Sequence, residues 1–265
     1  MFFSRSLLTA AAVVALGAAN LFAADPNHGM AYRFTELKGM NVENSAGENL
    51  GEIEDVVYDQ GSGKVRYVAV SFGGFLGVGD KLFAVPWGAL KHENDTVNGK
   101  HRIVMNADKK SLENAPGFDT NAWPNVADPK WSAEVDKFYG DAHGVKADGD
   151  PGPGYRLSMI NGLDVQNSQN ENLGEIKDSV IDVDQAKVRY FAVSFGGFLG
   201  VGDKLFAVPY SAVKIQTNAE GKDAHVVMNV DKATLEKAPS FTNDRWPNVA
   251  DEAWSKENDA HYQAK

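Results

Sequence analysis

The sequence contains no cysteine among its 265 residues. A disulfide and a cysteine-linked lipid anchor are therefore both excluded. Stability in an oxidising compartment then has to come from packing alone. Hydrophobic residues make up 43% of the chain, which is enough apolar material for folded cores in one or two domains.

Basic residues are in deficit. The chain has 26 Lys and Arg against 36 Asp and Glu, which gives a formal net charge of -10 at pH 7. Binding to a phosphate backbone needs clustered Lys and Arg, so we do not expect nucleic acid as a partner. The acidic residues are spread along the chain, as is typical of a soluble surface.

Long hydrophobic runs are absent after the first segment. Arg5 precedes an apolar run over residues 7–19, and small residues lie around Ala23 and Ala24. This order is typical of a secretory signal peptide, so we expect residues 1–23 to be removed and the protein to be periplasmic or otherwise exported. A membrane span needs roughly 20 apolar residues, and none is expected after signal removal.

The remainder of the chain consists of two copies of one sequence, offset by 123 positions without any gap. Residues 69–86, for example, recur letter for letter at 192–209. This period is much longer than that of a solenoid unit. The sequence therefore predicts two whole domains, 32–139 and 155–262, joined by a Gly/Pro-rich linker at 140–154.

Hydrophobic residues within each copy alternate mostly with a period of two. The first copy is predicted to form strands at 50–59, 64–72, 81–87 and 101–106, followed by a short helix at 108–114. A second helix is predicted to open at Asp128-Pro129 and to run to about Tyr139, with Asp128 as the cap and Pro129 at the first position; the second copy repeats it from Asp251 to Tyr262 without the proline. Short strands at this spacing indicate a mainly β fold, a small barrel or sandwich. We expect each copy to have its own core, so that a fragment ending at Gly144 folds alone.

A glycine-rich connection at residues 73–80 leads into a strand. Phosphate-binding loops lead into a helix, so a β-hairpin is predicted instead of a nucleotide site. The apolar residues of this connection either fold back onto their own barrel or contact a protein partner. Their identity in both copies favours contact, since a core would tolerate swaps of similar volume. The candidate protein-contact residues are Phe75, Leu76, Val78, Phe198, Leu199 and Val201.

The histidines argue against catalysis and against metal binding. No histidine has a histidine counterpart in the other copy, and none has the spacing of a ligand pair. Ser71 and Ser194 match, but no matched histidine could activate them. We therefore expect no enzyme activity, no catalytic residue, no cofactor site and no metal site. We interpret the histidines as scattered surface residues: His28, His92, His101, His143, His225 and His261.

Matched acids occur at Asp55 and Asp178, beside apolar strand residues, and matched arginines at Arg66 and Arg189 on the following strand. A cross-strand ion pair is the structural interpretation. A carboxylate that carries a proton is the functional alternative.

Four tryptophans flank the helical segments, at Trp123, Trp131, Trp246 and Trp254. Such residues usually pin a short helix to a sheet, because each buries a large area. A ligand-stacking groove is the alternative.

Residues 50–91 and their copy at 173–214 resemble the PRC-barrel family. The pattern that carries the resemblance is Leu50-Gly-Glu-Ile53, Asp55-Val-Val57, Val65-Arg-Tyr67, Gly73-Gly-Phe-Leu-Gly77 and Leu82-Phe-Ala-Val-Pro-Trp87. The resemblance implies two tandem small antiparallel β-barrels, each followed by short helices, that dock onto other proteins. It supplies no catalytic residues to carry over to this sequence.

These observations favour a non-catalytic periplasmic protein-interaction or scaffold protein, with a link to envelope stress as a further hypothesis. The partner is an unidentified protein, and self-association is compatible with the sequence. The alternative, from another functional class, is a small-ligand or cofactor-binding protein with a tryptophan-lined groove.

Overall fold

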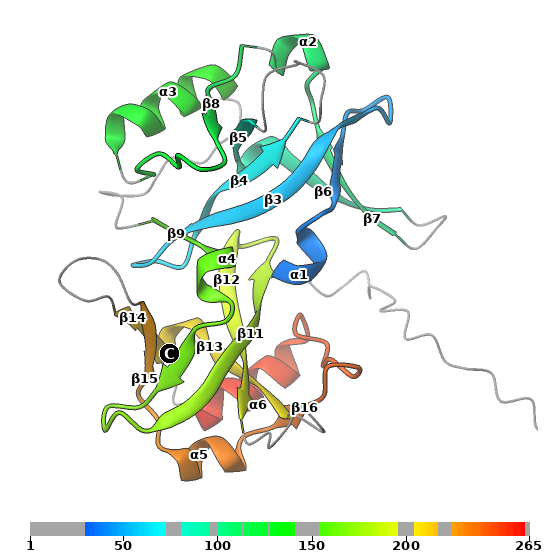
Figure 1. Cartoon of the computed structure of the whole chain (residues 1–265). Helices are drawn as coiled ribbons and strands as arrows, with labels where there is room; N and C mark the ends of the chain where they lie inside the picture. The colour runs from blue at the N-terminus through cyan, green and yellow to red at the C-terminus, as the bar shows by residue number, and fades with distance from the viewer. Residues whose placement is uncertain are drawn as a thin grey trace, which may run out of the picture.

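The computed structural model describes residues 30–72, 81–95, 100–112, 114–126, 128–140, 154–195, 204–216 and 224–262 (Figure 1). The expected signal peptide at 1–23 and residues 141–153 of the expected linker lie outside the described residues.

The same order of elements occurs in both repeats. The first repeat contains β1 (Ala31–Arg33), α1 (Phe34–Leu37), β2 (Asn41–Glu43), β3 (Asn49–Asp59), β4 (Val65–Ser71), β5 (Lys81–Pro86), the 3-10 helix η1 (Trp87–Ala89), β6 (Leu90–Asp95), β7 (Lys100–Met105), α2 (Lys109–Leu112), β8 (Gly117–Asp119) and α3 (Pro129–Tyr139). The second contains β9 (Gly154–Arg156), α4 (Leu157–Ile160), β10 (Asp164–Gln166), β11 (Asn172–Asp182), β12 (Lys187–Phe195), β13 (Lys204–Pro209), the 3-10 helix η3 (Tyr210–Ala212), β14 (Val213–Gln216), β15 (His225–Met228), α5 (Lys232–Lys237), β16 (Ser240–Phe241) and α6 (Glu252–His261). The mainly β prediction and its main strands are confirmed.

The strands form two mixed sheets, with the orders β6-β7-β2-β3-β4-β5-β8 and β14-β15-β10-β11-β12-β13-β16. The prediction of two small antiparallel β-barrels differs from the structure in two respects. β2 pairs with β7 in parallel, as β10 does with β15, because the return strand of the β6–β7 hairpin runs in the same direction as β2. Neither sheet closes on itself within the described residues, since the edge strand β8 pairs only with β5.

The two repeats exchange their first strands. β1 of the first repeat pairs with β11 of the second, with Tyr32 opposite Ile181, and β9 of the second repeat pairs with β3 of the first, with Tyr155 opposite Tyr58. Figure 1 shows β9 beside β3 and α1 beside β11. Each sheet is therefore completed by the other repeat.

The exchange obeys a two-fold pseudosymmetry. Lys64 and its counterpart Lys187 form a bridge with each other. The backbone nitrogen of Val65 donates to the carbonyl of Ala186 at 2.7 Å, and that of Val188 to the carbonyl of Gly63 at 2.9 Å. Equivalent residues pair directly only at a two-fold axis, so the axis passes beside this bridge.

The core is shared between the repeats. One main cluster of buried apolar side chains extends from Tyr32 in the first repeat to Tyr262 in the second. Residues 56–59 of β3 are buried in succession, as in a strand that is covered on both faces. The expectation that each repeat has a core of its own is therefore wrong, because the end of β3 packs against the other repeat.

The helix at the end of each repeat follows the predicted capping pattern. The side chain of Asp128 accepts a hydrogen bond from the backbone nitrogen of Lys130, and Pro129 occupies the first helical position of α3. Asp251 caps α6 in the same way. In the part of the chain that the structure describes, no helix is long and apolar enough to cross a membrane.

Candidate functional site

The first turns of α1 and α4 are capped by carboxylates from the opposite repeat. The backbone nitrogen of Thr35 donates to Asp178 Oδ1 at 3.2 Å, and that of Ser158 donates to Asp55 Oδ1 at 3.1 Å. The hydroxyl groups of Thr35 and Ser158 donate to the second oxygens of the same carboxylates. The first backbone N–H groups of a helix have no partner within the helix, and these aspartates supply one across the repeat boundary.

Both capping carboxylates are buried. Asp55 is 3% exposed and Asp178 is 4% exposed. Burial raises the pKa of each carboxyl above its ordinary value, and the hydrogen bonds from Ser158 and Thr35 act in the opposite direction. The two carboxyl groups are therefore structural caps, and burial and hydrogen bonding have opposite effects on their pKa values.

The predicted ion pairs between these acids and the matched arginines are wrong. Arg66 instead pairs with Asp59, at 2.7 Å, and Arg189 pairs with Asp182, at 3.3 Å. The register explains the difference: Asp55 lies opposite Ala69, and an irregularity near the end of β3 brings Asp59 within reach of Arg66.

Two of the four tryptophans contact the exchanged strands. The guanidinium of Arg156, in β9, lies 4.3 Å from the ring centroid of Trp123. Arg33, in β1, has the equivalent contact with Trp246 at 4.8 Å. Each cation–π contact joins one repeat to the other.

The other two tryptophans pin helices, as the structural interpretation predicted. Trp131 of α3 meets Tyr67 of β4 edge-on, with ring centroids 5.3 Å apart. Trp254 of α6 meets Tyr190 of β12 in the same way at 5.5 Å. The four tryptophans thus serve packing and repeat–repeat contact.

A matched aromatic residue crosses the boundary from each repeat. Trp87 Nε1 donates to the carbonyl of Val183 at 3.4 Å, and the hydroxyl of its counterpart Tyr210 donates to the carbonyl of Gln60. Val183 and Gln60 are themselves counterparts. The hydrogen bond is thus kept although the residue that donates it differs.

His92 corrects the expectation that the histidines lie on the surface. Its ring stacks on Trp87 with centroids 4.5 Å apart, and Tyr32 lies 5.6 Å away on another side. Both ring nitrogens are buried and have no hydrogen-bond partner among the described residues. Burial lowers the pKa of His92 to about 4, and the nearby Asp184 of the other repeat has the opposite, smaller effect.

The counterparts of Trp87 and His92 in the second repeat are Tyr210 and Ile215, and both line a cavity. The cavity, of about 200 Å³, lies at the boundary beside Tyr210. No tryptophan lines it, so it is not the groove proposed from the sequence. Its lining residues are Gln60, Gly61, Phe191, Tyr210, Val213, Lys214 and Ile215.

Comparison with known proteins assigns the two repeats. A sequence model of the PRC-barrel domain matches residues 30–112 and 153–231, which together make up more than half of the chain. The chain belongs to the PRC-barrel family. The two matches confirm the tandem copies inferred from the 123-residue offset. No curated protein matches the sequence.

Each PRC-barrel match includes an exchanged segment, either β1 with α1 or β9 with α4. A domain that is continuous in sequence is therefore divided between two sheets in space. Sequence reasoning identified Asp55 and Asp178 but not their partners. The available signal was a hydroxyl residue kept at both Thr35 and Ser158.

The candidate protein-contact residues of the PRC-barrel repeats, Phe75, Leu76, Val78, Phe198, Leu199 and Val201, lie outside the described residues. The strands that flank them are described. β4 pairs with β5 and β12 pairs with β13 in antiparallel fashion, as a hairpin connection requires. Among the described residues, no group of His, Asp and Glu side chains is arranged to hold a metal ion.

Proposed function

We propose that this protein is a non-catalytic, exported protein-interaction or scaffold protein of the periplasm that presents two copies of one contact surface. We call these surfaces the two contact loops, residues 73–80 with Phe75, Leu76 and Val78, and residues 196–203 with Phe198, Leu199 and Val201. The observation that carries the proposal is the fixed, opposed placement of the strands that flank the two loops.

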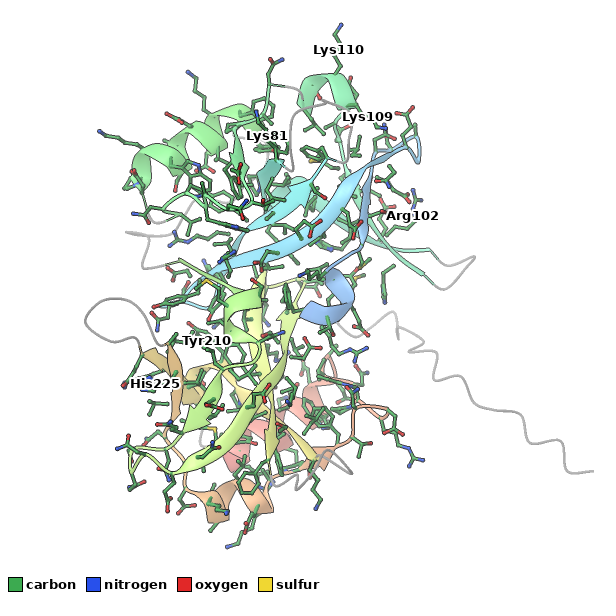
Figure 2. All side chains as sticks on the ribbon, viewed as in Figure 1. Lys81, Arg102, Lys109, Lys110, Tyr210 and His225 are labelled. Carbon is green, nitrogen blue, oxygen red and sulfur yellow. The ribbon has the colours of Figure 1, made fainter. Side chains whose placement is uncertain are left out.

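This placement follows from the direction of β4. Its first residue, Val65, is hydrogen-bonded across the repeat boundary, and the strand ends at Ser71. At about 3.3 Å per residue the strand spans roughly 20 Å from this hydrogen bond to Ser71. Figure 2 shows Lys81, the first residue of β5, in the first repeat and farther from the boundary than Tyr210.

The pseudosymmetry gives β12 and β13 the equivalent arrangement. Val188, near the start of β12, is hydrogen-bonded to Gly63 across the boundary, and β12 ends at Phe195. The two contact loops therefore connect strand ends that point away from each other. The exchanged strands, the caps and the shared core hold this spacing. Two loops of identical sequence, each flanked by strands of opposed direction, suit a scaffold that links two copies of a partner.

The test uses serine substitutions in the contact loops. The single variants Phe75→Ser and Phe198→Ser and the double variant are each compared with a control variant, Met159→Ser. The control replaces an exposed side chain of α4. Protein captured from envelope extract by the full chain is identified, and its stoichiometry is then measured with purified components by sedimentation. Each single substitution should halve the number of bound partners, and the double substitution should abolish binding. Truncation of an aromatic anchor typically costs about 2 kcal/mol or more of binding free energy.

The folding stability of the unbound chain separates contact from core. A surface substitution usually changes the free energy of unfolding by within about 0.5 kcal/mol. If the double variant loses several kcal/mol of folding stability, the phenylalanines belong to the core and the proposal fails. It also fails if the double variant binds the captured partner as tightly as the Met159→Ser control does.

A further inference from the structure

The cavity at the repeat boundary is built from both repeats. The turn after β3 contributes Gln60 and Gly61, and the second repeat contributes the remaining walls. Phe191 is fully buried, and Lys214 is exposed. Figure 2 shows Tyr210 at this boundary, between the two halves of the molecule. The walls are largely apolar, with one cationic side chain.

The first repeat has a different pair of side chains at the equivalent positions. There Trp87 replaces Tyr210 and His92 replaces Ile215. The imidazole of His92 stacks on the indole, and Trp87 is only 4% exposed. Tyr210 has a smaller ring system than Trp87, and Ile215 has no ring at all. The cavity therefore corresponds to the place of one planar ring stacked on an aromatic side chain.

The size of the cavity agrees with a single ring. Apolar cavities of about 150 Å³ in other proteins admit benzene. The present cavity, of about 200 Å³, has room for one six-membered ring with a small substituent. The ring of Tyr210, which packs against the buried ring of Phe191 with centroids 6.2 Å apart, offers an aromatic surface.

Two polar groups define the substituents. The ammonium group of Lys214 suits a carboxylate. The side-chain nitrogen of Gln60 donates to the carbonyl of Ile215 at 2.8 Å, which leaves Gln60 Oε1 as an acceptor for a ligand hydroxyl or ring N–H.

We propose that this cavity binds a small monocyclic aromatic carboxylate, with its ring against Tyr210 and its carboxylate at Lys214. This site is independent of the contact loops and extends beyond the proposed scaffold function. Because the cavity contains residues of both repeats, a bound ring stabilises their association.

The experiment uses the full chain with four probes: benzoate, 4-hydroxybenzoate, benzamide, which lacks the charge, and cyclohexanecarboxylate, which lacks the aromatic ring. Binding is measured by NMR titration and by the shift in the unfolding temperature. We expect the two aromatic carboxylates to bind more tightly than the two controls. The proposal is overturned if neither aromatic carboxylate binds at millimolar concentration, or if the controls bind equally well.

The decisive variant, called the filled variant, introduces the aromatic pair of the first repeat, Trp and His, at the equivalent positions of the cavity. Tyr210→Trp combined with Ile215→His should reduce the affinity for 4-hydroxybenzoate at least about tenfold, which is about 1.4 kcal/mol. The converse change, Trp87→Tyr with His92→Ile, should open an equivalent space and raise the stoichiometry from one to two. Unchanged binding in the filled variant overturns the proposal.

A milder variant keeps the proposal testable if the filled variant does not fold. Lys214→Ala removes only an exposed side chain. It should weaken carboxylate binding about two- to fivefold, as expected for the loss of an exposed ion pair, and leave the binding of benzamide unchanged. Equal losses for benzamide and 4-hydroxybenzoate, or no loss for either, contradict the assignment of the carboxylate to Lys214.

Discussion

The carboxylate of Asp178 accepts a hydrogen bond from the backbone nitrogen of Thr35 at 3.2 Å, although 143 residues separate the two in sequence. Its counterpart Asp55 holds Ser158 in the same way. Each bond fixes the first turn of a short helix to the sheet of the opposite repeat. A helix of four residues cannot be stable by itself, so these caps and the exchanged strands maintain one another.

The caps predict a specific loss of stability. Asp178→Ala leaves the backbone nitrogen and the hydroxyl of Thr35 without their acceptor in a partly buried site. We expect the free energy of unfolding of the full chain to fall by about 2 kcal/mol. Urea unfolding should show a similar loss for Asp55→Ala. The control is Asp164→Ala, at an exposed position of β10, which should change stability by within about 0.5 kcal/mol. A loss no greater than that of the control would show that the caps do not stabilise the exchange.

His92 predicts an acid sensitivity of the repeat boundary. Burial lowers its pKa from 6.5 to about 4, so between these values the unfolded chain binds more protons than the folded one. The stabilising contribution of neutral His92 is present above pH 6.5 and is lost as the pH falls toward 4. Each pKa unit corresponds to 1.36 kcal/mol, so the loss is at most about 3 kcal/mol.

Substitution by the residue of the other repeat isolates this effect. His92→Ile introduces the side chain that the second repeat has at the equivalent position, Ile215, and removes the titrating group. Unfolding free energies measured at pH 7.5, 6 and 5 should show that wild type loses stability relative to His92→Ile as the pH falls. His261→Ala, at an exposed position of α6, should follow wild type. Parallel pH profiles for wild type and His92→Ile would contradict the burial of a neutral imidazole.

The repeat, the main strands and the helix caps could be predicted from the sequence, because they depend on local patterns. The exchange could not be predicted. Tyr32 and Arg33 have the same identities as Tyr155 and Arg156, so either pair fits β3 or β11 equally well at the level of residue types. The choice depends on how the whole chain packs.

The sequence-based predictions of an Asp55–Arg66 ion pair and of a surface position for His92 were both wrong. Asp55 is a matched acid, but it lies opposite Ala69, three residues along β4 from Arg66, so the predicted pair cannot form. His92 has no histidine counterpart because position 215 holds isoleucine, and this difference hid its buried position. The comparison of repeats reveals what the copies share, whereas His92 and the cavity arise where the copies differ.

A fragment that contains a single repeat shows whether folding depends on the exchange of first strands. In a fragment of residues 24–144, β9 and α4 are missing, so the edge of β3 and the carboxylate of Asp55 lack their partners. The same fragment contains β1 and α1, whose Tyr32, Arg33 and Thr35 are the counterparts of the missing residues. Two copies can therefore exchange these segments with each other.

Sedimentation equilibrium of this fragment, combined with circular dichroism across a dilution series, distinguishes the two outcomes. The exchange predicts a folded dimer whose structure is lost as dilution separates the copies. A folded monomer that unfolds cooperatively at a concentration-independent midpoint would show that each PRC-barrel repeat is complete by itself and does not need the exchanged strand.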